Sequence, residues 1–170
     1  MKKLTEKLLL TSCIAFAAST VTADWHAGAG AYNSTINETA FEKYDAGYGL
    51  IVGWTPESNS FMPSENLFLS AEGSYQKLGS FMITTEDEAV VSAWTAQGVL
   101  TLSLSEIDLY GKLGFSYSDF DGDNSFDPYI AAGAAYSITE KVDVYGEYQS
   151  FELTDGINIY TYGAGLKAKF

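Results

Sequence analysis

NIYTYGAGLKAKF, the stretch from residue 158 to residue 170, alternates between two kinds of side chain. One set of alternate positions is apolar and partly aromatic, namely Tyr160, Tyr162, Ala164, Leu166, Ala168 and Phe170. The other set is mostly small or charged, namely Ile159, Thr161, Gly163, Gly165, Lys167 and Lys169. Because successive side chains of a strand point to opposite faces, we expect a strand with one apolar face. That face could pack on a protein core or meet lipid.

The same alternation recurs along the chain and predicts eight strands. They are expected at residues 25–32, 44–54, 66–77, 94–104, 107–117, 128–138, 141–153 and 158–170. Strands of roughly ten residues can cross a bilayer when they are tilted. The composition, with 15% aromatic residues and 16 glycines, also favours an all-β chain.

The predicted connections between these strands alternate in length. Residues 33–43, 78–93 and 118–127 are long, whereas residues 105–106 and 139–140 are very short. Long external loops and short periplasmic turns in alternation are typical of outer-membrane barrels. Two connections fit this pattern less well, because residues 55–65 are long for a turn and residues 154–157 are short for a loop.

Eight strands in lipid are expected to close on themselves, because lipid offers no partner to an unpaired backbone group. The prediction is an all-β fold, an eight-stranded antiparallel up-and-down transmembrane β-barrel, with room inside only for side chains. Aromatic residues near strand ends would form the interfacial girdles, namely Trp54, Trp94, Tyr75, Tyr117, Tyr160 and Phe170. A soluble lipocalin-like binder is the alternative, and it would carry the apolar set inside. Its outer wall would then be glycine, serine and isolated charges, which is poor for solubility.

The start of the chain has the pattern of a secretory signal peptide. Three lysines precede the apolar run of residues 8–18, which is too short to span a bilayer, and residues 21–23 form a small-residue cleavage site. We therefore expect residues 1–23 to be removed after Ala23 and residues 24–170 to form one domain. Cys13, the only cysteine, could mark a lipoprotein instead, but the apolar run continues past it.

The charge balance is strongly acidic. The net charge is -13, from 22 acids and 9 bases, and removal of residues 1–23 takes away three lysines and one glutamate. The remaining 21 acids and 6 bases give a net charge of -15, which argues against a nucleic-acid partner. No stretch after residue 23 reaches 18 consecutive apolar residues, so no transmembrane helix is expected.

The length after cleavage, the eight strands and the final aromatic residue make residues 24–170 resemble small outer-membrane barrels. The families in question are the OmpA transmembrane domain, OmpX and the opacity proteins. The stretch GLKAKF, with Gly165, Ala168 and Phe170, resembles the C-terminal signal that the barrel assembly machinery reads, although Gly163 stands where a polar residue is usual. The resemblance implies a monomer in the outer membrane of a Gram-negative cell, with that machinery, lipid and lipopolysaccharide as partners.

Four charged residues fall on the predicted inner face, namely Glu72, Lys112, Glu147 and Lys167. In OmpA-like barrels an acid, a lysine, an acid and a base on the corresponding strands form an interior ion-pair network. The resemblance implies the same network here, although the base is Lys167 where the family often has arginine, so bidentate pairing is lost. Such a network could be a satisfied plug or a functional gate.

One predicted loop is rich in aspartate. Residues 118–127 contain Asp119, Asp121, Asp123 and Asp127, and several such oxygens in one loop are the ligands that Ca²⁺ takes. Counted from Asp119, the sixth and twelfth positions are Asn124 and Ile130, so an EF-hand does not fit. The four aspartates are weak candidates in a solvated loop, and we predict neither a metal nor a cofactor.

His26, the only histidine, is expected on the inner face near the periplasmic end. Some eight-stranded barrels are lipid A-modifying enzymes, which need a histidine, a serine and an acid on the outer side. His26 lies at the wrong end for that role, so we expect no enzyme. The leading hypothesis is a structural, OmpA-like barrel with a polar interior that is plugged or narrowly conducting. The alternative is an opacity-type adhesin or surface-binding protein that acts through its long acidic loops.

Overall fold

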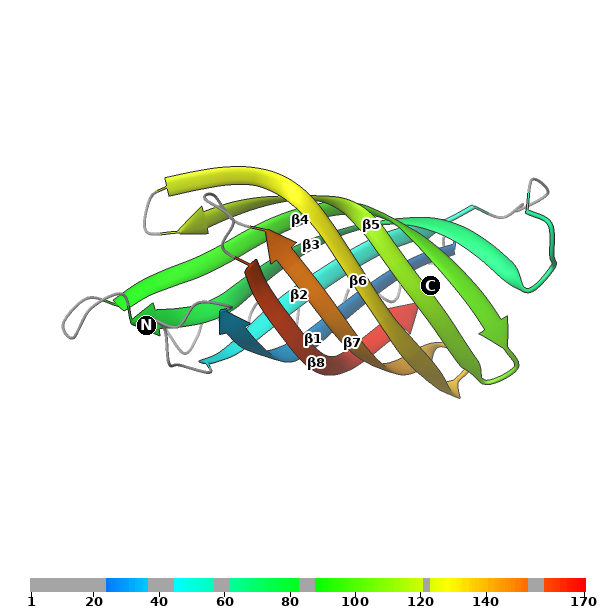
Figure 1. Ribbon diagram of the computed structural model, residues 1–170. Coiled ribbons are helices and arrows are strands. Elements are labelled where there is room, and N and C mark those ends of the chain that lie inside the picture. The colour runs from blue at the N-terminus through cyan, green and yellow to red at the C-terminus, as the bar shows by residue number, and fades with distance from the viewer. Residues whose placement is uncertain (1–23, 37–44, 57–61, 83–87, 121–122, 153–157) are drawn as a thin grey trace.

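In the computed structural model the chain forms eight antiparallel strands that close into one barrel (Figure 1). The structure describes residues 24–36, 45–56, 62–82, 88–120, 123–152 and 158–170, so the predicted signal peptide lies outside the described residues. The strands are β1 (Asp24–Ile36), β2 (Asp45–Thr55), β3 (Leu67–Met82), β4 (Glu88–Leu104), β5 (Ile107–Phe120), β6 (Asp123–Thr139), β7 (Val142–Glu152) and β8 (Asn158–Lys169). The predicted fold class is confirmed.

The last strand closes the barrel. β8 pairs with β7 on one side and with β1 on the other, from His26 opposite Lys169 to Ile36 opposite Ile159. The backbone N–H of Phe170 donates to the carbonyl oxygen of Trp25 at 2.9 Å, which extends the seam by one bond. Because every strand has two neighbours, the sheet has no open edge, as a sheet in lipid requires.

The outward face of the barrel is apolar, whereas the inward face carries the buried charged and polar side chains together with two apolar clusters. Trp94, Leu113 and Phe126 on the outside are 61%, 70% and 67% exposed, whereas Glu72 and Lys112 on the inside are buried. This distribution suits contact with lipid, and it shows that the lipocalin-like alternative is wrong, because that fold needs the reverse. No helix among the described residues is long and apolar enough to cross a membrane.

Two of the predicted long loops are wrong, because strands continue through them. β3 runs on to Met82 and β4 begins at Glu88, while β5 runs to Phe120 and β6 begins at Asp123. A β-bulge between Lys77 and Gly79 interrupts the alternation in β3, which hides the rest of that strand from a period-two pattern. In β5 and β6, polar residues such as Ser118 and Ser125 pair across the ladder, since backbone pairing does not require apolar side chains. These four strands form a taller wall than the others (Figure 1).

The two short turns lie close to their predicted places. Ser105 and Glu106 join β4 to β5, and Ser105 has a φ of 63°, which a two-residue hairpin turn requires. The turn between β6 and β7 is Glu140–Lys141, one residue later than predicted, because a bulge between Ser137 and Thr139 lengthens β6. We call this end of the barrel, where β1 also begins and β8 ends, the turn end. The opposite end, where β3 and β5 end, is the loop end.

The interior of the barrel is filled in successive layers from the turn end to the loop end. A cavity lies at the turn end, and charged side chains close its inner limit. Tyrosine rings lie beside these charged side chains, and polar side chains follow. At the loop end, an apolar cluster fills the interior, and it consists of Leu78, Val91, Ala93, Tyr129, Ala131, Phe151 and Ile159. We call this set the loop-end cluster.

Candidate functional site: the interior ion-pair network

Charged side chains from four strands meet inside the barrel. Lys112 on β5 lies between two carboxylates, with its Nζ 2.7 Å from Glu72 Oε2 and 2.6 Å from Glu147 Oε2. Lys167 on β8 lies with its Nζ 3.0 Å from Glu72 Oε1. The structure therefore brings together the four residues that the resemblance implied.

Glu72 has two further partners, and neither of these contacts could be predicted from the sequence. His26 Nε2 lies 2.8 Å from Glu72 Oε1, and the side-chain amide of Gln97 lies 3.5 Å from Glu72 Oε2. His26 and Glu72 stand on strands that are separated by β2, and Gly53 of β2 pairs with both residues. A Cβ at Gly53 would overlap the His26 ring, so the absence of a side chain there lets the two residues meet. The sequence feature that permits this contact is Gly53, which lies opposite both residues. Its position can be recognised only when the register of β1, β2 and β3 is known.

Burial and charge balance define what the network can do. Glu72, Lys112 and Glu147 are each about 5% exposed or less. Buried charges cost several kcal/mol unless they are paired, and here two carboxylates face two ammonium groups, so the four sum to zero. Each of these four side chains is therefore paired with an opposite charge.

Polar contacts continue the network toward the loop end. Gln149 donates to Glu147 Oε1 at 2.5 Å, and Thr161 in turn donates to Gln149 Oε1 at 3.0 Å. The hydroxyls of Tyr32 on β1 and Tyr145 on β7 are hydrogen-bonded at 3.0 Å on the inner side of β8, the strand between them. These side chains come from β7, β8 and β1, three consecutive strands of the closed barrel, so their contacts strengthen this part of the wall.

Glycines make room for the interior tyrosines. A Cβ at Gly165 would lie 2.6 Å from the Tyr145 hydroxyl, and one at Gly133 would lie 2.6 Å from the Tyr110 hydroxyl. The Gly165 position would also clash with the backbone oxygen of Ala29 on β1. Gly165 was predicted as part of an assembly signal, and the structure gives it a packing role as well.

The other predicted site residues lie apart from the network. Ala168 pairs with Ala27 and Val142 in the seam beside Phe170. Within the described ranges, no three histidine, cysteine or acidic side chains come close enough to hold a metal ion. Asp119 faces outward on β5 and Asp127 inward on β6, so these two do not converge. Asp123 begins β6, and Asp121 lies outside the described residues.

A comparison with protein families decides what kind of barrel this is. The family model described as "Outer membrane protein beta-barrel domain" matches residues 8–170. The chain belongs to this family. Members of the outer membrane β-barrel family reside in the outer membrane, which agrees with the apolar outward face. No curated protein sequence matches the chain.

Several solved structures share the fold. Ail, the attachment invasion locus protein of Yersinia pestis in complex with the heparin analogue sucrose octasulfate, has 14% identity and a TM-score of 0.60, covering 88% of this chain and 100% of Ail. Neisserial surface protein A has 14% identity and a TM-score of 0.57, covering 86% and 97%. The outer membrane enzyme PagL has 13% identity and a TM-score of 0.55, covering 84% and 99%. At such identities the likeness concerns the fold alone.

Proposed function

We propose that this outer-membrane barrel is a structural, OmpA-like protein whose interior is sealed and does not conduct ions. The observation that supports the proposal is that side chains fill the barrel interior at two positions along its axis. The ion-pair network fills the interior near the turn end, and the loop-end cluster fills it again farther along. Of the two forms expected from the sequence, plugged and narrowly conducting, the packing supports the plugged one.

The loop-end cluster excludes ions by a mechanism that is independent of charge. Leu78, Tyr129 and Phe151 are fully buried, and the rings of Tyr129 and Phe151 pack with their centroids 5.0 Å apart. An apolar constriction of this kind is a barrier because an ion would have to shed its water there. A rearrangement of the ion pairs alone would therefore leave the second closure in place.

The proposal predicts a silent bilayer in single-channel recording. The purified barrel is inserted into a planar bilayer, and its orientation and insertion are confirmed by protease protection. We expect no discrete openings, and the Glu72→Gln variant should be silent as well, because the loop-end cluster remains. Openings of the unaltered barrel would contradict a sealed interior, and openings of Glu72→Gln alone would show that the cluster is not a barrier.

A second candidate function is surface binding at the loop end. The observation in its favour is the taller wall of β3 to β6, whose Val90 and Phe126 are exposed. Ail, which shares the fold, is an attachment protein that was solved with an anionic sulfated sugar. Residues 24–170 carry a net charge of -15, so a partner of this chain would be cationic rather than anionic.

The remaining partners belong to the same proposal. A monomer held in lipid and lipopolysaccharide, inserted by the barrel assembly machinery of a Gram-negative cell, is consistent with the closed seam and the apolar outer face. The absence of enzymatic activity stays a prediction. Its support is that His26, the only histidine, contacts Glu72 at the turn end, where short turns indicate the periplasmic side.

A further inference from the structure

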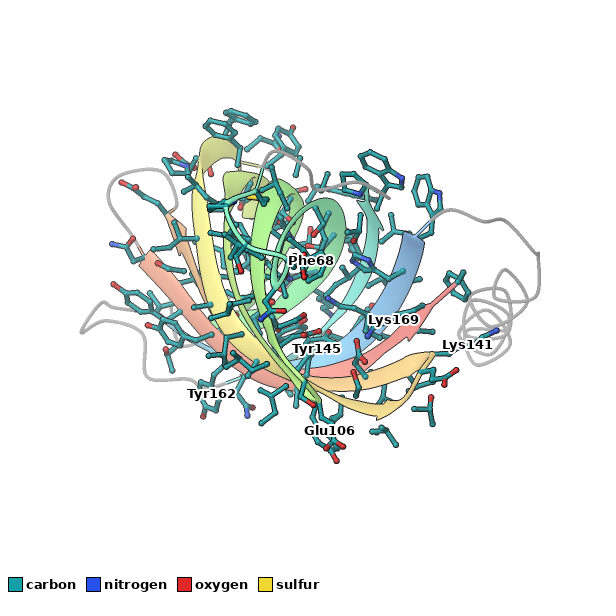
Figure 2. The ribbon with its side chains drawn as sticks, turned by 90° about the vertical axis from the view of Figure 1, so that its right-hand side faces the viewer. Phe68, Glu106, Lys141, Tyr145, Tyr162 and Lys169 are labelled. Carbon is teal, nitrogen blue, oxygen red and sulfur yellow. The ribbon has the colours of Figure 1, made fainter. Side chains whose placement is uncertain are left out.

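A cavity of about 670 Å³ opens at the turn end of the barrel and ends at the ion-pair network. Residues 62–66, which precede β3, lie along one side of its mouth, where the N–H of Ser103 donates to the Asn66 carbonyl at 2.8 Å. Figure 2 looks along the barrel and shows Phe68 within the ring of strands and Lys169 on the inner side of β8. The volume is that of a small-molecule site.

Acidic groups outnumber basic groups in the cavity wall. Four carboxylates line it, from Glu65, Glu72, Asp108 and Asp143, against the two ammonium groups of Lys167 and Lys169. Lys167 is paired with Glu72, and Lys169 is paired with Asp143 at 2.9 Å. In the part of the chain that the structure describes, Glu65 and Asp108 form no ion pair, which leaves an excess of two negative charges in the wall.

The two unpaired carboxylates lie on the same side of the mouth. Ser103 on β4 links them, because its hydroxyl donates to Asp108 Oδ1 at 2.5 Å and its backbone N–H is bonded to Asn66, the residue after Glu65. Glu65 is exposed, and Asp108 is partly exposed, so both can be reached by a ligand. This geometry suits a ligand with two positive charges rather than one.

An aromatic ring stands beside these carboxylates. Phe68 is an inward-facing residue of β3 that lines the cavity, together with Met62. Among the described residues Phe68 belongs to neither buried apolar cluster and stacks on no other ring. An aromatic face attracts a cation, and the two apolar side chains offer a surface for a hydrocarbon chain.

We propose that this cavity binds a linear aliphatic diamine or polyamine. Its ammonium groups pair with Glu65 and Asp108, and its methylene chain lies on Phe68 and Met62. An anionic ligand is disfavoured, since both lysines already have carboxylate partners. A metal ion is disfavoured because the wall offers no cluster of three ligating groups among the described residues, and a metal ion would not use the apolar surface.

The test is calorimetric titration of the purified full barrel in phosphatidylcholine nanodiscs, which lack the phosphate-rich lipids that bind amines themselves. The probes are 1,5-diaminopentane and pentylamine, which share a chain but differ by one charge. We expect saturable binding of one diamine per barrel and markedly weaker binding of the monoamine. Glu65→Gln and Asp108→Asn should each lower the affinity for the diamine about five-fold, which is the upper end of the effect of a solvent-exposed ion pair.

The matched control is Glu140→Gln, which removes one negative charge at the same end of the barrel but outside the cavity. The affinity of this variant for the diamine should equal that of the unaltered barrel. Phe68→Leu should lower the affinities for the diamine and the monoamine by the same factor. The proposal is overturned by the absence of saturable heat at millimolar diamine. It is also overturned if Glu140→Gln weakens binding as much as the two cavity variants, because the interaction would then be with general surface charge. A conducting barrel would contradict the proposed function but would leave this result unchanged.

Discussion

Glu72→Gln is expected to lower the free energy of unfolding by about 3–5 kcal/mol, the usual loss when one member of a buried ion pair is removed. Glu72 is the carboxylate that Lys112, Lys167 and His26 share. Glutamine keeps the size of the side chain but removes the carboxylate with which Lys167 forms its ion pair. The measurement is urea-induced unfolding of the barrel in lipid vesicles, followed by tryptophan fluorescence.

Two further variants make the interpretation specific. Glu152→Gln removes an exposed carboxylate at the loop end and should change stability by less than about 0.5 kcal/mol. The double variant Glu72→Gln, Lys167→Met restores the charge balance around Lys112 and should recover part of the lost stability. If Glu72→Gln unfolds at the same urea concentration as the unaltered barrel, the network does not hold the interior together.

Gly165→Ala should destabilise the barrel by about 1–3 kcal/mol, the range for overpacking a filled interior. The added methyl group would meet the Tyr145 hydroxyl and the backbone oxygen of Ala29. The tyrosine can rotate, but the backbone of the neighbouring strand cannot move without disturbing the β1–β8 seam. The same urea titration in lipid vesicles measures this loss.

The control for this change is Gly111→Ala, where the added methyl group meets nothing within 4 Å. That variant should be neutral or slightly stabilising, because alanine restricts the unfolded chain more than glycine does. Vesicles contain no assembly machinery, so a loss of stability there reflects packing. If Gly165→Ala is as stable as the unaltered barrel in vesicles but fails to assemble in cells, the glycine acts through recognition alone.

Which side chains point into the barrel and which point outward could be predicted from the sequence, because this depends only on the alternation of polar and apolar residues along each strand. The inward positions of Glu72, Lys112, Glu147 and Lys167 follow from the period of two, and a family resemblance implied their pairing. Closure of the sheet could be predicted because lipid offers no partner to an unpaired backbone group. These features require no knowledge of how far one strand slides along the next.

Features that depend on register or on backbone pairing could not be predicted. The contact of His26 with Glu72 requires Gly53 to stand opposite both residues, and that depends on the offsets between β1, β2 and β3. The extra length of β3 to β6 lies beyond the predicted stretches, where a bulge after Lys77 breaks the period in β3 and packing in the loop-end cluster involves Leu78 and Val91. The cavity depends on how residues 62–66 fold over the mouth, which no periodic pattern describes.

The sealed interior is tested most directly by the access of water to two serines on the same strand. Ser70 lines the cavity, whereas Ser74, on the other side of Glu72 along β3, is buried and hydrogen-bonded to Thr95 at 2.6 Å. Residues 24–170 contain no cysteine, so Ser70→Cys and Ser74→Cys can each carry a single thiol. The measurement is the rate at which a water-soluble maleimide labels each thiol in nanodiscs. Each rate is divided by the rate for the same variant when it is unfolded. The sealed interior predicts rapid labelling at position 70 and almost none at position 74, whereas equal rates at both positions would show that water passes the ion-pair network.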